Sequence, residues 1–388
     1  MLTWLAAGPS HAQPSSQAPA SSTAPLPCQP RLSRSLLDRS LALGTSFLLA
    51  NQRPAGNFEY QYDWQSRRYD SNDSQVRQAG AAWGLALIHQ DQPTPAVAAA
   101  LLRALRFFRQ HSRLTTDGRR YIVYPGSEVG SLGTVALVAL AHIDYLRSVD
   151  DPTLRQQLDE YLAFVVSARR KQGRFHGAYD HDDGAHLGNP SPYFDGESLL
   201  ALVKASKYLG RSDLRGLALR EAEAGHRLNV VEARRRDPDS KTTKGYYQWS
   251  SMAYFELATS SWPGSERYGD WLIEQADWMI DTHRTLRRRR NTAYAYEGLI
   301  PAYAVARARG DRAHVAKLGC TIEEGLGKLT SWQVGSPTAN AFVAKASKQD
   351  AKARGGVQNH ASEPGLRIDV AQHQMHAVLL ARRHYLTP

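Results

Sequence analysis

The chain has 388 residues, of which 42% are hydrophobic, and 48 Lys and Arg against 37 Asp and Glu give a net charge of +11. The mean hydropathy is −0.48, and no apolar run approaches the roughly 20 residues of a transmembrane helix. Two cysteines, Cys28 and Cys320, are too few for a disulfide framework or a zinc site, although a single bridge between them is open. Neither GxGxxG after a strand nor GxxxxGKS/T occurs, which argues against dehydrogenases and kinases.

The first 30 residues differ in composition from the rest. Met1–Ala12 is similar to the end of a secretory signal, but it has no charged start and no full apolar core. Gln13–Pro27 is rich in Ser, Ala and Pro, which predicts a disordered linker. We therefore expect a truncated signal-like segment and linker over residues 1–30 and a single domain over residues 31–388. The protein is then periplasmic or secreted, or cytoplasmic if the first segment is not a signal remnant.

From Ser33 onward, apolar residues recur with helical spacing. FEYQYDWQ, within Gly56–Tyr69, alternates aromatic and polar residues and predicts a short β-hairpin. Beyond it, amphipathic basic helices alternate with helices that have a polar entry and an Ala/Leu-rich body. The Ala/Leu-rich helices are expected at Asp73–Gln90, Glu128–Leu146, Asp195–Leu209, Gln248–Ala258, Asn291–Arg307 and Leu366–Tyr385.

Six such pairs of helices recur with a period of roughly 55–60 residues, which is typical of a repeat architecture. The last helix looks as buried as the first, so the array is expected to close on itself instead of ending in polar caps. Small side chains suit a tight inner ring and charged ones suit the outside. The prediction is an all-α (α/α)6 toroid of six helical hairpins, with short β-hairpins in the mouth loops and the inner-helix N-termini at one mouth.

Residues 33–385 resemble the six-hairpin toroid superfamily of glycoside hydrolases, polysaccharide lyases and uronyl epimerases. Several segments also resemble a bacterial family without a secure reaction. These segments are DSNDSQVRQAG (Asp70–Gly80), GSLGTVALVALA (Gly130–Ala141), YFDGESLLAL (Tyr193–Leu202), QWSSMAYFELA (Gln248–Ala258) and LRIDVAQHQMHAVLL (Leu366–Leu380). The resemblance implies an enzyme that cleaves or modifies a polysaccharide or oligosaccharide, either neutral or acidic.

Glycosidic cleavage needs two carboxylates across the scissile bond. An Asp beside a helix start is often only an N-cap, but Glu197 and Asp369 lie inside small or aliphatic helices, where an unpaired charge is costly. His373 lies one turn after Asp369 and suits a general base. The predicted catalytic residues are Asp73, Glu197, Asp369 and His373.

Aromatic side chains gather beside the expected inner-helix starts, where sugar rings could stack on them. Core packing is the competing interpretation for each of them. Further polar residues lie at the same helix starts. The predicted substrate-binding residues are Tyr62, Trp64, Arg77, Glu128, Tyr193, Asp195, Trp249, Tyr294, Tyr296, Glu297 and His360.

Glycoside hydrolysis is the favoured activity, because several carboxylates are expected at the mouth. A uronic-acid polysaccharide lyase or C5-epimerase is the alternative, and the positive net charge favours it. Its proton transfer and carboxylate binding would use Tyr296, His373, Arg77, Gln78 and Asn291. A non-catalytic glycan-binding toroid in polysaccharide synthesis or export is the third possibility.

We expect no cofactor, no metal and no nucleic-acid partner. DHDDG at Asp180–Gly184 lacks the later Glu of an EF-hand loop. The basic runs Arg234–Arg236 and Arg287–Arg290 lie at predicted helix ends or loops and are interpreted as solvated faces. No basic stripe with interleaved aromatics lies on one element, which argues against nucleic-acid binding.

Overall fold

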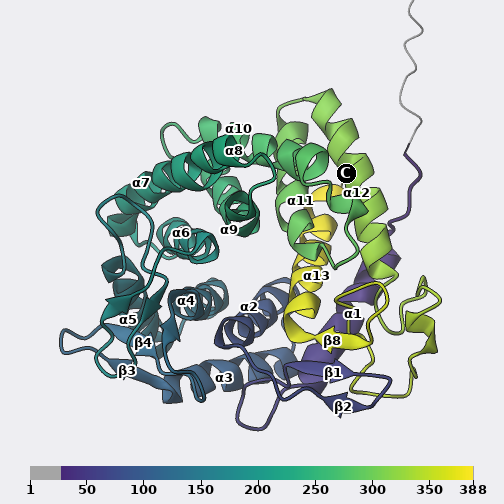
Figure 1. The fold of residues 1–388 in the computed structure, drawn as a ribbon, viewed down its shortest axis with the longest axis horizontal. Coiled ribbons are helices and arrows are strands. Elements are labelled where there is room, and N and C mark those ends of the chain that lie inside the picture. Colours follow the sequence, from purple (N-terminus) through teal and green to yellow (C-terminus); the bar gives the residue numbers. More distant parts are fainter. Residues whose placement is uncertain (1–27, 388) are drawn as a thin grey trace, which may run out of the picture.

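The computed structural model describes residues 28–387, so most of the predicted signal-like segment and linker lies outside it. Six helices form a closed inner ring in the described part of the chain (Figure 1). Each packs against the next, and the last packs against the first. In chain order the inner helices are α2 (Gln75–Asp91), α4 (Leu132–Leu146), α6 (Pro192–Tyr208), α9 (Lys241–Ala258), α11 (Ala293–Ala308) and α13 (Ile368–Leu380).

An outer layer of helices surrounds this ring, which confirms the predicted (α/α)6 toroid. The outer helix between α6 and α9 is interrupted by the π-helix η2 (His226–Val231), whose turn is wider than that of an α-helix, so it consists of two α-helical parts. The outer helices are α1 (Arg34–Ala50), α3 (Pro95–Gln110), α5 (Pro152–Ser167), α7 (Arg215–Gly225) with α8 (Glu232–Arg236), α10 (Glu266–Asp277) and α12 (Arg312–Thr330).

The helices pair into hairpins differently from the prediction, in which each inner helix was paired with the outer helix that precedes it. Each inner helix packs most closely on the outer helix that follows it, and α1 packs on α13 to complete the last pair. Connection length explains the difference: α2 ends at Asp91 and α3 begins at Pro95, whereas the return to the next inner helix runs through a long loop. Short connections favour antiparallel neighbours. The long loops therefore all lie at one end, the mouth.

Short strands line that mouth, as predicted. β1 (Gln61–Asp63) pairs with β2 (Arg68–Tyr69) and also with β8 (Gly365–Arg367), which joins the two ends of the chain. The last helix, expected from Leu366, therefore begins only at Ile368, and it continues after Leu380 as the π-helix η6 (Ala381–Tyr385). The remaining strands are β3 (Ser112–Leu114), β4 (Arg120–Ile122), β5 (Gly130–Ser131), β6 (Ala178–Tyr179) and β7 (His186–Leu187).

Small residues let the inner helices approach closely. A Cβ atom on Gly84 would lie 2.7 Å from Cγ of Gln372, and one on Gly298 would lie 2.6 Å from the Tyr247 hydroxyl. Both distances are below van der Waals contact, so a larger residue would push neighbouring inner helices apart. The Gly- and Ala-rich pattern therefore reflects the tight ring.

Cys28, which is exposed, and Cys320, which is half-buried, are both free thiols, so no bridge joins them in this structure. Burial and the neighbouring Cys320 raise the pKa of the Cys28 thiol to about 11. Among the described residues, no helix is both long and apolar enough to cross a membrane.

Candidate active site

A cavity of about 1020 Å³ opens at the N-terminal ends of the inner helices. All six inner helices contribute to its wall, and of the polar residues that these helices provide, most lie on α6, α9 and α13. Helix N-termini carry a partial positive charge, so their convergence favours bound oxygen atoms and anions. Residues of the loops before α11 and α13 complete the rim.

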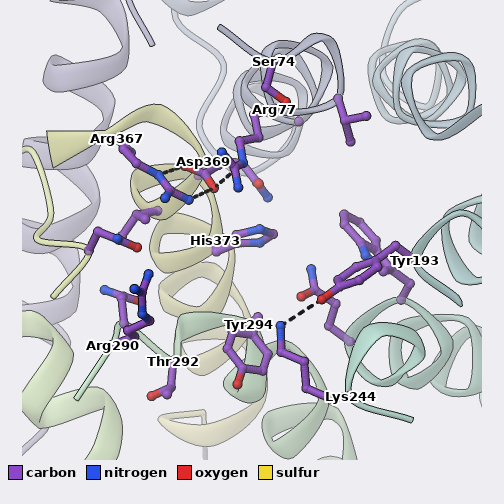
Figure 2. A pocket seen from close by; sticks show the side chains of 18 of the residues that line it. Ser74, Arg77, Tyr193, Lys244, Arg290, Thr292, Tyr294, Arg367, Asp369 and His373 are labelled. Carbon is purple, nitrogen blue, oxygen red and sulfur yellow. Dashed lines mark hydrogen bonds and ion pairs between the residues drawn. The ribbon is translucent and has the colours of Figure 1, made fainter. Parts of the chain in front are cut away.

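His373 stands in the middle of this cavity (Figure 2). Its Nδ1 lies 3.1 and 3.2 Å from the two carboxylate oxygens of Glu297, a fully buried residue on α11. His376, one turn further along α13, places its Nδ1 2.9 Å from the same carboxylate. With Nδ1 of His373 engaged, the Nε2 atom is the one left for the cavity.

Electrostatics make the His373 ring a stronger base than a free histidine. Burial lowers the pKa of His373, but the Glu297 carboxylate outweighs it and the net pKa is raised. Burial likewise works to raise the pKa of Glu297, yet the two histidines hold that pKa below its usual value. Glu297 is therefore ionised and orients the imidazole, as a carboxylate does for a catalytic base.

Two guanidinium groups share one carboxylate beside His373. Arg367 donates from Nε to Oδ1 of Asp369 at 2.9 Å, and Nε of Arg77 lies 3.2 Å from Oδ2. Burial works against ionisation of Asp369, but Arg367 and Arg77 lower its pKa below the ordinary value. Figure 2 shows this cluster on one side of the His373 ring. The cluster carries one excess positive charge, which suits a negative charge on a bound molecule.

Glu197 of α6 is a second kind of carboxyl group on the cavity wall. It is 2% exposed, its Oε2 has no partner in the protein, and burial raises its pKa to about 8. At neutral pH it is therefore mostly protonated and can donate a hydrogen bond or a proton. Gly133 of α4 makes room for it, because a Cβ there would collide with Oε2.

Two buried amides on the same wall also lack protein partners. They are Nε2 of Gln248 and Nε2 of Gln372, on α9 and α13. Buried polar atoms are nearly always hydrogen-bonded. Together with Oε2 of Glu197, they are three buried polar atoms on cavity-lining residues that have no hydrogen-bond partner in the protein.

Aromatic residues and a lysine form the side opposite the arginine pair (Figure 2). Lys244 donates to the Tyr193 hydroxyl at 3.1 Å, and its Nζ lies 4.5 Å from the ring centre of Tyr294. Trp249 lies against His373, with ring centres 6.1 Å apart. Tyr193 is 38% exposed, which is unusual for a large aromatic side chain. Such faces suit stacking of a sugar ring.

The structure brings most of the predicted residues to this cavity. Glu297 is buried and does not line the cavity, but it bonds to His373, which does. The predicted residues that line the cavity are Asp73, Arg77, Tyr193, Glu197, Trp249, Tyr294, His360, Asp369 and His373. Asp73 is tied at the rim, where it accepts from the Tyr124 hydroxyl at 2.6 Å and from Gln78 at 2.7 Å.

Five predicted binding residues lie elsewhere. Tyr62 is buried and donates to Asp350 at 2.8 Å, and Trp64 packs edge-on against Phe342. Glu128 is exposed in the loop before β5 and does not reach the cavity.

Asp195 and Tyr296 face away because of helix geometry. Asp195 pairs with Arg174 at 2.7 Å, whereas Tyr296 is fully buried against Gly325 of α12. Each lies two residues from a cavity residue on the same helix, and such neighbours point to nearly opposite sides.

Lys244 and three arginines were not predicted to belong to the site. Arg288, Arg289 and Arg290 line the cavity, which corrects the interpretation of this run as a solvated face. A signal was present, since the run directly precedes an inner helix and so belongs to the mouth. The DHDDG segment closes the turn between β6 and β7, where Asp182 N donates to Asp180 at 2.7 Å. In residues 28–387, no cluster of three or more His, Cys, Asp or Glu could hold a metal ion.

Comparisons with known proteins agree on the fold. No protein-family model and no curated protein matches the chain. Cellobiose 2-epimerase from Spirochaeta thermophila is 17% identical with a TM-score of 0.64, covering 90% of this chain and 96% of that one. D-mannose isomerase is 12% identical with a TM-score of 0.63, covering 90% and 98%.

A third similar structure is a GH76 α-1,6-mannanase from Salegentibacter, solved with mannotriose as a variant inactivated at two adjacent aspartates. It is 8% identical with a TM-score of 0.61, covering 90% of this chain and 99% of that one. These neighbours all act on carbohydrates and share the toroid. Identities this low establish the fold and not the reaction.

Proposed function

We propose that this protein is a carbohydrate-modifying enzyme that removes and returns a proton at a sugar carbon next to a carbonyl or carboxylate group. The proposal rests on one observation: His373 is oriented by the buried Glu297 and stands in the cavity beside two guanidinium groups. Sugar epimerases and isomerases, and lyases of uronic acids, all begin with such a proton transfer. The epimerase and isomerase among the similar folds support the first pair.

In the proposed reaction, Nε2 of His373 takes the proton and the C–H electron pair moves onto the adjacent oxygen. Arg77 and Arg367 stabilise the negative charge that develops there, because their two positive charges are only partly balanced by Asp369. Glu197, mostly protonated at neutral pH, supplies the proton that returns to carbon. Tyr193 and Trp249 hold the sugar ring by stacking.

Hydrolysis is the second candidate, because a protonated carboxyl such as Glu197 is what a general acid requires. Its predicted partner Asp369 is held by two arginines, which weakens it as a base or nucleophile. The adjacent aspartates of this chain, Asp150–Asp151 and Asp182–Asp183, do not line the cavity. We therefore place proton transfer ahead of hydrolysis.

The test is an incubation in heavy water with cellobiose, mannose, mannotriose and a galacturonate oligomer, followed by NMR and a reducing-end assay. We expect deuterium to enter the sugar at the carbon beside the carbonyl or carboxylate. The incorporation should disappear in His373→Asn and persist in His314→Asn, which changes a histidine on the outer helix α12.

Two results would overturn the proposal. New reducing ends without deuterium, lost in Glu197→Gln, would identify a hydrolase. Sugar binding with no change to any substrate would identify a non-catalytic toroid.

Export to the periplasm or beyond stays a prediction, to be checked by locating the full-length protein in cell fractions.

A further inference from the structure

A second, smaller cavity of about 550 Å³ adjoins the main one. It is lined by Pro238, Asp239, Thr282, His283, Arg284, Arg287 and Arg288. His283 and Arg288 line both cavities, so the two spaces share a wall. A molecule longer than one sugar could therefore occupy both.

The shared wall is held firmly in place. His283 bonds through Nδ1 to Asp239 at 2.7 Å and through Nε2 to the Tyr294 hydroxyl at 3.2 Å, and its ring stacks on Trp278. Arg288 donates to Asp239 at 3.1 Å. Among the residues that the structure describes, Asp239 is the only carboxylate on the wall of the second cavity, and its contacts with His283 and Arg288 already engage it.

The other arginines here have no counter-charge. Within residues 28–387, no carboxylate lies within 4.0 Å of the guanidinium groups of Arg284, Arg287, Arg289 or Arg290. Five arginines within residues 284–290 repel one another and create a strongly positive surface. Because this surface is concave and continuous with the reaction cavity, it differs from a solvated convex face.

The backbone also bends to present this surface. Arg284 adopts a left-handed conformation with φ of 55°, which few residues other than glycine adopt. The 3-10 turn η4 (Thr285–Arg287) follows it and leads into the rim of the main cavity. Lys244 and the Arg77–Arg367 pair continue the positive charge toward His373.

We propose that residues 284–290 form a subsite for the anionic groups of an oligosaccharide whose reacting unit occupies the main cavity. This inference rests on the proposed function and adds the substrate class: an acidic oligosaccharide bearing carboxylate or sulfate groups. Arg284 and Arg287 bind a unit beyond the reacting one, while Arg289 and Arg290 bind the connection between the two cavities.

The experiment measures dissociation constants by calorimetry for free galacturonate, a galacturonate oligomer, a sulfated oligosaccharide and mannotriose. The variants are Arg284→Gln/Arg287→Gln and, as a matched control, Arg106→Gln/Arg109→Gln, which removes the same charge from exposed positions of α3. We expect the first variant to bind acidic oligomers about tenfold more weakly or worse, since charged contacts of this kind add affinity. Binding of free galacturonate should stay unchanged, because one sugar fits the main cavity alone.

Added salt should weaken acidic-oligomer binding to the wild type more than to this variant, because salt screens exposed charges. Equal binding of acidic and neutral oligomers, or equal loss in the control variant, would overturn the inference. The galacturonate and sulfated arms tell which anionic group is preferred. Failure of the proposed reaction would be seen separately, as deuterium incorporation that His373→Asn does not affect.

Discussion

Buried carboxyl groups at the two ends of the inner ring differ in whether they have partners. At the end opposite the mouth, called the closed end below, Asp144 of α4 accepts from Lys204 at 2.6 Å and from the Trp83 indole at 2.7 Å, and Arg147 lies 3.2 Å away. Burial would raise the pKa of Asp144, but Lys204 and Arg147 lower it below the usual value. At the mouth, Glu197 has no such partner and its pKa is raised to about 8.

The difference separates a structural group from a candidate functional one. A buried charge with every partner in place stabilises the packing of α2, α4 and α6 around it. A buried carboxyl without a partner costs stability and persists at a cavity wall, where perturbed groups cluster in active sites. Four substitutions can break or sharpen this comparison.

The largest effect is expected from His373→Asn at the mouth. Removing the general base should lower the rate of deuterium exchange by about 10²- to 10⁴-fold. The protein should remain folded, because the side chain is partly exposed to the cavity. The measurement is the exchange rate with circular dichroism as the folding control. If His373→Asn lowered the exchange rate no more than the control His314→Asn does, His373 would have no part in the mechanism.

At the closed end, Asp144→Asn should destabilise the fold by about 3–5 kcal/mol, because the Lys204 ammonium is left buried without a counter-charge. Urea unfolding measures the loss. The control Asp159→Asn breaks an exposed pair with Arg211 and should cost about 0–1 kcal/mol. Equal effects of the two variants would show that the closed-end cluster is not a structural unit.

Glu197→Gln should change how stability depends on pH. Because the folded pKa of about 8 exceeds the unfolded value, the wild type is most stable relative to the variant below the unfolded pKa. Between the unfolded and the folded pKa, the free energy of unfolding of the wild type falls by about 1.4 kcal/mol per pH unit relative to that of the variant. The loss is complete once the pH has passed the folded pKa. Thermal or urea unfolding of both proteins across this range measures it. Parallel curves would mean that Glu197 is ionised or partnered in the fold.

The smallest change is expected from Glu297→Gln, which removes the carboxylate that bonds to Nδ1 of His373 on the side away from the cavity. Without the carboxylate, the pKa of His373 should fall, and the acid limb of the exchange rate should move to lower pH. The pH–rate profile and an NMR titration of the imidazole measure this shift. An unchanged limb with a lower rate would mean that Glu297 only holds the helix packing.

The sequence alone determined the fold class, and it predicted where the candidate site lies. Helical spacing, the Ala- and Gly-rich inner helices and the repeat length predicted a closed toroid, because only small side chains pack in a tight inner ring. The polar entries of the inner helices placed the candidates at one mouth. Glu197, Asp369 and His373 were found this way, and all three line the cavity.

Only the tertiary structure decided which of those groups are paired and which are available. Asp369 and Glu197 look alike in sequence, yet two arginines from different elements neutralise the first and none reaches the second. The partner of His373 is Glu297, from another inner helix 76 residues away in the chain. Such pairings depend on how the ring closes, because electrostatic partners are set by distance in space and not by spacing along the chain.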